Sequence, residues 1–303
     1  MRVPHWPKWL HPLWMPPSVG IVIATRDRRS TLLRTLERLK RLPEHPGIVV
    51  VDNGSRDHTA AAVRQRYPDV DLHRLPADVG ASARSIGVDA LDTELVAFND
   101  DDSWWAPGAL DRAARLFAAH PRLGLLAAQI RVGPDERLDP TCAEMARSPL
   151  PAEPGAPGRP VLGFVACGAV VRRSAFLEAG GFRGHRIGGE EHLLALDLAS
   201  AGWALAYVDE VVAHHVPPRS GPGNGRRHAE LESAFVATWL RRRPLTALGH
   251  TIRLLRQPDS GRDRWGALLT ALEQVPWIIR NRRALPWRIE RTLALLPGPG
   301  VRA

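Results

Sequence analysis

The chain of 303 residues contains little cysteine and no long apolar run. Cys142 and Cys167 are its only thiols, which excludes a disulfide framework and a thiolate zinc site and favours a reducing, cytoplasmic compartment. The longest apolar run, residues 161–171, is about half as long as a bilayer-spanning helix. Proline and tryptophan interrupt residues 1–17 too often for the core of a signal peptide, so we expect an irregular arm there. These absences predict a chain that does not cross a membrane.

Lysine is missing from the C-terminal part of the chain, although that part is strongly basic. Residues 216–303 contain 16 arginines and six acidic residues, so they carry the whole formal net charge of +9. Such a tail suggests a polyanionic partner, and no nucleic-acid-binding module is visible, so we expect no nucleic acid. Apolar residues alternate with the arginines, as in helices that lie on an anionic membrane surface, here its inner face. The alternative is that these apolar residues pack on the rest of the protein or on a second subunit.

The first hundred residues alternate β-branched runs with amphipathic segments. Such alternation is typical of a parallel, doubly wound sheet with helical crossovers, and it predicts an α/β fold. The expected strands are residues 20–24, 48–51, 70–75 and 95–98, and the expected helices are residues 30–42, 57–66 and 81–90.

The rest of the chain is predicted more coarsely. We expect one domain over residues 18–216, a linker over 217–225 and a basic amphipathic helical extension over 226–303. Within the domain the pattern predicts a helix at 107–119, a strand at 123–132, a Pro-rich loop at 133–160, a strand-like run at 161–171, a helix at 190–201 and a last strand at 204–212.

Three consecutive carboxylates, Asp100, Asp101 and Asp102, follow an apolar run that should be a buried strand. The carboxyl ends of strands are where open α/β sheets bind ligands. Grouping three acids there costs repulsion, which a hard divalent cation shared with substrate phosphates would offset. The alternative is a surface turn whose aspartate caps the following helix. The run therefore predicts a site for Mn²⁺ or Mg²⁺.

Several motifs in order make the chain resemble the family 2 glycosyltransferases, which have the GT-A fold. The resemblance covers roughly residues 18–216, and it implies transfer of a sugar from a nucleotide donor with inversion at the anomeric carbon. The motifs are GIVIATRDR, IVVVDNGSRDHT, GASARSIG, VAFNDDDSWW, GGFRGHRIGGEEHLLALDLASAGW and VVAHH.

The resemblance implies a nucleotide-sugar pocket at four positions. Asp52 matches the aspartate that contacts the nucleobase, and its other role would be that of a turn residue before a glycine. Thr25 and Arg26 match positions that line the pocket, although Arg26 and Asp27 replace the commoner Tyr-Asn pair. Arg84 matches a position that pairs with phosphate or the base edge, since its planar fork suits oxyanions. A solvated surface charge is the alternative for Arg84.

The resemblance also assigns the metal site and the base. Asp100 matches the first acid of the DxD element, which contacts ribose or metal, and Asp102 matches the acid that coordinates the cation; Asp101 lies between them. His214 takes the position of a second metal ligand, with His215 as the neighbouring alternative.

Glu191 takes the position of the general base that deprotonates the acceptor hydroxyl, with Glu190 beside it. Glu191 replaces the usual aspartate, which lengthens the reach by one methylene. Acids in a first helical turn are also favoured by the helix dipole alone.

Two function classes remain from the sequence. The first is a metal-dependent inverting glycosyltransferase acting on a lipid-linked or cell-surface glycan precursor. The second is a non-catalytic nucleotide-sugar-binding or scaffold protein on the same fold. A nucleotidyltransferase would need a Gly-rich basic loop after the first strand, and residues 24–27 are not such a loop.

Overall fold

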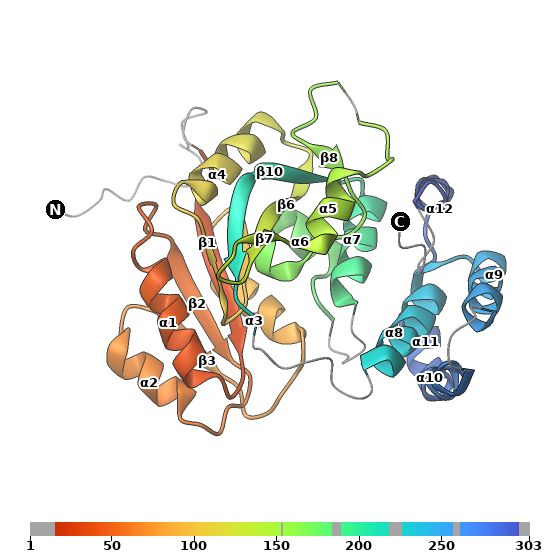
Figure 1. Cartoon of the computed structure of the whole chain (residues 1–303), viewed down its shortest axis with the longest axis horizontal. Helices are drawn as coiled ribbons and strands as arrows, with labels where there is room; N and C mark the ends of the chain where they lie inside the picture. Colours follow the sequence, from red (N-terminus) through yellow and green to blue (C-terminus); the bar gives the residue numbers. More distant parts are fainter. Residues whose placement is uncertain (1–15, 153, 184–188, 218–225, 257–260, 297–303) are drawn as a thin grey trace.

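The computed structural model describes residues 16–152, 154–183, 189–217, 226–256 and 261–296. One mixed sheet with the strand order β3-β2-β1-β4-β9-β6-β10-β5 runs through the domain, and two short strands, β7 and β8, pair with β6 and β10. Helices pack along it (Figure 1). This confirms the expected α/β class.

The N-terminal half of the sheet is parallel, as its sequence pattern predicts. Strands β1 (Val19–Thr25), β2 (Gly47–Asp52), β3 (Asp71–Arg74) and β4 (Leu95–Asn99) pair in the same direction. Helices α1 (Arg29–Leu39), α2 (Thr59–Arg66) and α3 (Ser82–Ala90) connect them. Helix α3 lies so close to the sheet that a Cβ at Gly87 would stand 2.5 Å from a Val22 methyl carbon.

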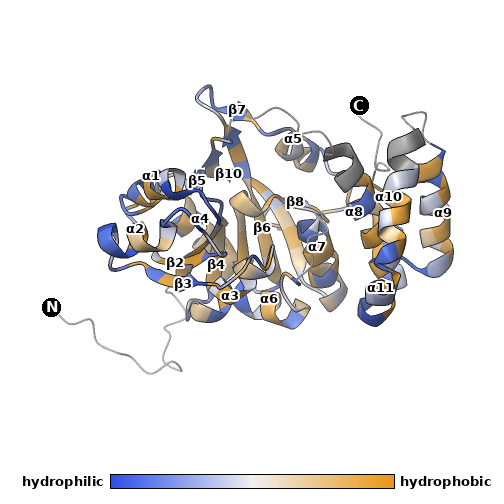
Figure 2. Ribbon diagram, turned by 90° about the horizontal axis from the view of Figure 1, so that it is seen from below, coloured by the Kyte–Doolittle hydropathy of each residue, from blue (hydrophilic) through white to orange (hydrophobic). Residues whose placement is uncertain are grey.

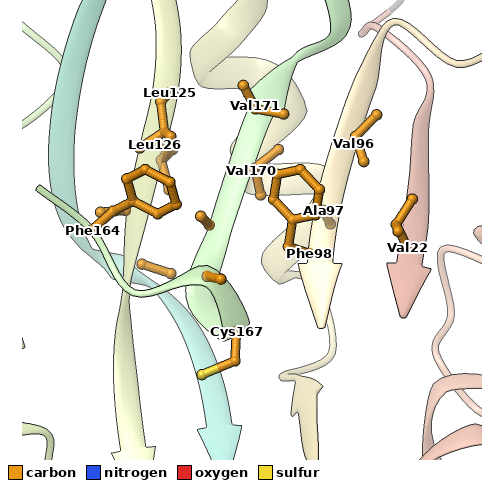
Figure 3. Packing of buried hydrophobic residues seen from close by; sticks show 14 of the residues in the cluster. Val22, Val96, Ala97, Phe98, Leu125, Leu126, Phe164, Cys167, Val170 and Val171 are labelled. Carbon is orange, nitrogen blue, oxygen red and sulfur yellow. The ribbon is translucent and has the colours of Figure 1, made fainter. Parts of the chain in front are cut away.

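The second half of the sheet mixes directions. Strand β9 (Ala169–Arg172) is antiparallel to both β4 and β6 (Leu123–Val132). Strand β10 (Ala204–His215) is parallel to β6 and antiparallel to the short β5 (Ser103–Trp105). Helices α4 (Ala109–Ala119) and α7 (Glu190–Ala201) lie where the sequence predicts them. Figure 3 shows Phe98 of β4, Val171 of β9 and Leu125 of β6, which the strand register places on one face of the sheet, with Cys167 beside the end of β4.

The region expected to be a Pro-rich loop is partly ordered, which corrects the prediction. It contains β7 (Arg137–Leu138), α5 (Pro140–Ala146) and β8 (Arg159–Pro160). Asp139 caps α5 by accepting from the Thr141 N–H, and Pro140 opens the helix, so the proline here starts structure instead of breaking it.

The strand-like run at 161–171 was also only partly right. The strand starts at Ala169, after a 3-10 turn, η1 (Ala166–Gly168), and helix α6 (Arg173–Ala179) follows without having been predicted.

The basic extension forms a helical group beside α7 (Figure 1). Its helices are α8 (Arg226–Arg241), α9 (Pro244–Leu255), α10 (Gly261–Glu273), α11 (Val275–Asn281) and α12 (Trp287–Leu293). A small core of its own includes Phe235, Val236 and Leu240, and Leu193 of α7 belongs to the same cluster. Leu285 and Ile289 join the main core. Part of the extension's apolar surface thus packs on the domain.

Within the described ranges, no helix combines the length and apolar composition needed to cross a membrane. The arm expected at 1–17 lies almost entirely outside the described residues, as does the linker expected at 217–225.

Candidate active site

The site residues gather where β1, β2 and β4 end. Thr25 and Asp52 are the last residues of β1 and β2 and lie opposite each other, and Asp100 follows the last residue of β4. Because the carboxyl ends of parallel strands meet at one edge, residues 76 positions apart come into contact: Thr25 Oγ1 donates to Asp101 Oδ2 at 2.8 Å.

A buried polar turn holds the three aspartates in place. Asn99, fully buried, donates to the Ser103 carbonyl at 3.0 Å and accepts from Trp105 Nε1 at 2.6 Å. Ser103 Oγ accepts from the Asp100 N–H at 2.8 Å. Sequence reasoning missed Asn99 and Ser103, although an amide at the end of a buried strand was the available signal.

Asp52 has one carboxylate oxygen without a partner. The residue is fully buried, and Oδ1 accepts from the Ser55 N–H at 2.8 Å. Oδ2 is buried, and no described residue donates to it. Buried polar atoms are nearly always hydrogen-bonded, so this oxygen is suited to a ligand N–H such as that of a nucleobase.

Arg26 lies at the rim of the same region. It forms an ion pair with Asp78 on the loop after β3, and it is exposed. Asn53 Nδ2 donates to the same Asp78 carboxylate at 2.8 Å. Asp78 was not predicted, because nothing in the loop sequence distinguishes it from a solvated acid.

Arg84 and Asp100 form a pair at the centre of the site. Arg84 NH2 lies 2.5 Å from Asp100 Oδ1, while Arg84 Nε is buried without a hydrogen-bond partner among the described residues. Burial opposes the charge of Arg84, but Asp100 and Glu191 together raise its pKa. The sequence alternative of a solvated surface charge is therefore wrong for Arg84.

Asp101 faces the protein. Its carboxylate accepts from Thr25 Oγ1, and its backbone carbonyl accepts from Thr35 Oγ1 at 2.7 Å. Burial raises the pKa of Asp101 to about 6, against the opposing effects of Thr25 and Arg28. Asp101 and Thr25 are therefore hydrogen-bonded to each other within the protein.

Asp102 has both carboxylate oxygens occupied. Oδ1 lies 3.2 Å from His215 Nε2, and Oδ2 lies 2.5 Å from Arg28 NH2. Burial opposes its charge, but the hydrogen bond from His215 and the charges of His215 and Arg28 hold the pKa of Asp102 below its usual range. The same hydrogen bond raises the pKa of His215. Arg28 was not predicted as a site residue.

His215, not His214, faces the aspartates, which corrects the residue chosen from the sequence. Neighbouring side chains in a strand point to opposite faces, and β10 extends through both histidines. His214 Nδ1 lies 2.9 Å from Glu136 Oε1, and its ring stacks on Trp104 with centroids 5.3 Å apart. Arg38 lies over the same Trp104 ring, 3.6 Å from its centroid. Trp104 is thus engaged by protein groups.

A set of metal-binding side chains converges beside Asp102. One ligand atom each from Asp100, Cys167 and His215 lies within 4.8 Å of the others. Within this group the Asp100 carboxylate and the His215 imidazole are the kinds of ligand that suit a divalent cation such as Mn²⁺. Cys167 was not predicted here because a cysteine in an apolar run looks like core; burial raises the pKa of its thiol.

Glu190 and Glu191 occupy the first turn of α7, as predicted, and lie in different surroundings. Burial raises the pKa of Glu191, with Glu190 and Asp100 adding to the shift and Arg84 opposing it. Glu191 is therefore electrostatically coupled to the aspartate site. Glu190 lines a pocket toward the helical extension with Arg183, Asp197 and Trp277.

Comparison with known families agrees with this arrangement. The model of "Glycosyl transferase family 2" matches residues 20–180. The N-acetylglucosaminyl-diphospho-decaprenol L-rhamnosyltransferase of Mycobacterium tuberculosis is 30% identical over an alignment of 240 residues, and the match covers 66% of this chain and 77% of that protein.

Solved structures share the fold at lower identity. TarS of S. aureus, as residues 1–349 in complex with UDP-GlcNAc, gives a TM-score of 0.58 at 14% identity, covering 84% of this chain and 71% of that one. This chain spans only 43% of the longer TarS structure. The mannosyltransferase PcManGT of Pyrobaculum calidifontis, in complex with GDP-Man and Mn²⁺, gives 0.57 at 19% identity, covering 96% and 78%. Because the family match covers more than half of the chain, the protein belongs to glycosyl transferase family 2 and is a nucleotide-sugar-dependent glycosyltransferase of the GT-A fold.

Proposed function

We propose that the protein is a metal-dependent, inverting glycosyltransferase that transfers a sugar from a nucleoside-diphosphate donor to a hydroxyl of a lipid-linked acceptor. The observation that carries the proposal is the partnerless Asp52 Oδ2 at the same sheet edge as the Asp102–His215 pair. The lipid-linked acceptor is supported by the relative that acts on N-acetylglucosaminyl-diphospho-decaprenol.

In this proposal the donor base binds at Asp52 and the diphosphate lies beside Asp100 and Asp102. Asp100, Asp102 and His215 are the residues that would hold the cation. When bound, the cation supplies a Lewis acid that neutralises charge on the departing nucleoside diphosphate. Arg84, with its unpartnered Nε, can donate to a donor oxygen while keeping its contact with Asp100.

Glu191 is the proposed general base. It accepts the proton of the acceptor hydroxyl as the hydroxyl oxygen bonds to the anomeric carbon and the bond from that carbon to the phosphate oxygen breaks. Its burial raises its pKa toward the range where a carboxylate is an efficient base at neutral pH. A single displacement from the face opposite the leaving group inverts the anomeric carbon.

The helical extension is proposed to hold the enzyme at the anionic membrane surface that presents such an acceptor. Nine of the thirteen exposed large apolar side chains of the described chain lie on this extension. They include Leu245, Leu248 and Ile252 of α9 and Trp265, Leu269 and Leu272 of α10, whose spacing places each set on one face of its helix. Figure 2 shows hydrophobic residues along both helices. Among the described side chains of the extension, six arginines are exposed (253, 256, 280, 283, 288 and 291), whereas Glu273 is the one exposed acid. A location on the inner, cytoplasmic face stays a prediction from the sequence.

Transfer itself tests the function. The full chain is incubated with Mn²⁺, a panel of nucleotide sugars and a polyprenyl-diphosphate-linked N-acetylglucosamine, and the products are identified by mass spectrometry. Thermal stabilisation by each nucleotide is measured in parallel, because a ligand at 100 times its Kd adds about 2.7 kcal/mol. A glycosylated lipid supports the proposal. If nucleotides stabilise the protein but no donor sugar is transferred to the acceptor, the non-catalytic nucleotide-sugar-binding function is favoured instead.

A further inference from the structure

Arg28 contacts two of the three neighbouring aspartates. Its NH2 lies 2.5 Å from Asp102 Oδ2, and its Nε lies 3.0 Å from Asp101 Oδ1. The Nε is not aligned for a hydrogen bond and is buried without another partner in the described structure. The guanidinium therefore bridges two neighbouring carboxylates through charge, and one of its donors is unused.

A divalent cation and Arg28 compete for the same charge. His215 contacts one oxygen of Asp102 and Arg28 contacts the other, so a cation that coordinates this carboxylate shares its negative charge with both groups. A dication on Asp102 also weakens the attraction between Asp102 and Arg28, because the two positive groups repel each other across one carboxylate.

The structure leaves Arg28 room to move. It stands immediately before α1, and 31% of its side chain is exposed, compared with 9% for Asp102. Arg28 borders a hollow at the start of α1, shared with Arg29, Arg34 and Pro217. Arg28 belongs to neither apolar cluster, so a change of its rotamer does not remove a member of the core.

We propose that Arg28 is a positioning residue that neutralises Asp101 and Asp102 in the unloaded protein and passes to the donor diphosphate when cation and nucleotide bind. The inference rests on the proposed function. A planar guanidinium suits phosphate oxygens as well as carboxylates, so the exchange keeps Arg28 paired throughout. The charges also balance, since the incoming dication is matched by the diphosphate that Arg28 then contacts.

A measurable coupling follows from this exchange. Without a nucleotide, a cation on Asp102 repels Arg28 while no phosphate is present to receive it, so Mn²⁺ alone binds weakly. With a nucleoside diphosphate present, Arg28 gains a new partner and Mn²⁺ binds more tightly. Reciprocity requires that Mn²⁺ strengthen nucleotide binding by the same factor.

The test measures Mn²⁺ binding by the electron paramagnetic resonance signal of free Mn²⁺, with and without UDP, GDP or dTDP. We expect Arg28→Gln to bind Mn²⁺ alone more tightly than the wild type by about tenfold, the factor that corresponds to about 1.4 kcal/mol, and to bind the diphosphate more weakly. The matched control is Arg29→Gln, which removes one exposed positive charge at the same end of α1. That variant should leave both affinities near wild type.

The outcomes separate this inference from the proposed function. Unchanged or weaker binding of Mn²⁺ alone in Arg28→Gln overturns the exchange. Equal effects of Arg28→Gln and Arg29→Gln also overturn it, because they would show that long-range electrostatics alone changes the affinity. A wild-type protein without any Mn²⁺-dependent nucleotide binding overturns the proposed function as well. If Arg28→Gln does not fold, a wild-type structure with Mn²⁺ and the nucleotide decides: Arg28 on a phosphate supports the inference, and Arg28 still on Asp102 refutes it.

Discussion

Arg241 of α8 and Asp197 of α7 join the helical extension to the catalytic domain through two parallel hydrogen bonds. The Nε–Oδ1 and NH2–Oδ2 distances are both 2.7 Å, and the side chains are only 4% and 10% exposed. Helix α7 also carries Glu190 and Glu191 in its first turn. The helix that presents the proposed base is therefore braced by the extension.

Removing Arg241 should destabilise the protein strongly. Arg241→Leu leaves the Asp197 carboxylate buried without its partner, and breaking a buried pair in this way costs about 3–5 kcal/mol. Urea unfolding measures the loss. The double variant Arg241→Leu with Asp197→Leu should recover much of it, because no uncompensated charge remains. A loss below about 1 kcal/mol, the level of an exposed pair, would contradict this account.

Glu191→Gln should slow transfer by about 10² or more and leave Mn²⁺ and nucleotide binding intact, because only the proton acceptor is lost. Glu190→Gln is the matched control on the same helical turn, and it should stay near wild type. Single-turnover rates at saturating donor provide the measurement. If Glu190→Gln were the inactive variant, the base would be Glu190.

The pH profile of transfer should reflect the burial of Glu191. Burial raises its pKa above the ordinary value of 4.5, and the base works only when it is deprotonated. The acid limb of kcat/KM should therefore fall at a pH above that value, with activity present above the raised pKa and lost as pH drops through it. Stopped assays across the acid range test this. An acid limb at or below pH 4.5 would show that Glu191 is not the titrating base.

Asp102→Asn should abolish transfer and remove the Mn²⁺ dependence of nucleotide binding, since an amide replaces the charged oxygens that face His215 and Arg28. Asp92→Asn, at an exposed position before β4, is the control. Calorimetric titration of the nucleotide with and without Mn²⁺ gives the answer. Metal-dependent binding that persists in Asp102→Asn would rule out this carboxylate as the ligand.

Vesicle binding should depend on the exposed faces of α9 and α10. Replacing Leu245, Trp265 and Leu269 with serine removes three exposed apolar anchors, and Arg253→Gln with Arg256→Gln removes about 1 kcal/mol of attraction per charge near an anionic surface. Both changes should reduce co-sedimentation with anionic vesicles, and the arginine contribution should weaken as salt rises.

Substitution is a cleaner test of membrane binding than removing the extension. Truncation would expose Leu193 and leave Asp197 unpaired on α7. Leu177→Ser, which removes an exposed leucine from α6, is the control and should bind like the wild type. Negligible binding of the wild type at low salt would indicate that the apolar faces of α9 and α10 contact another protein.

The amino-acid sequence by itself determined the α/β class, the N-terminal β-α-β order and the grouping of Asp52, Asp100 and Asp102. These depend on local periodicity and on the rule that parallel strands end at one edge. Strand β6 and helix α7 were predicted with the bounds that the structure shows, because apolar residues fill most of each element. Helix α5 was missed because the surrounding prolines were taken as breakers.

Only the tertiary structure decided which polar groups meet. The pairing of β5 with β10 sets His215 opposite Ser103, and the alternation of side chains along β10 turns His214 toward Glu136 instead. Arg28 reaches Asp102 across 74 residues, and Arg241 reaches Asp197 across 44. Local propensity has no information on such long-range contacts, since they depend on strand register, helix packing and the direction in which each side chain leaves the backbone.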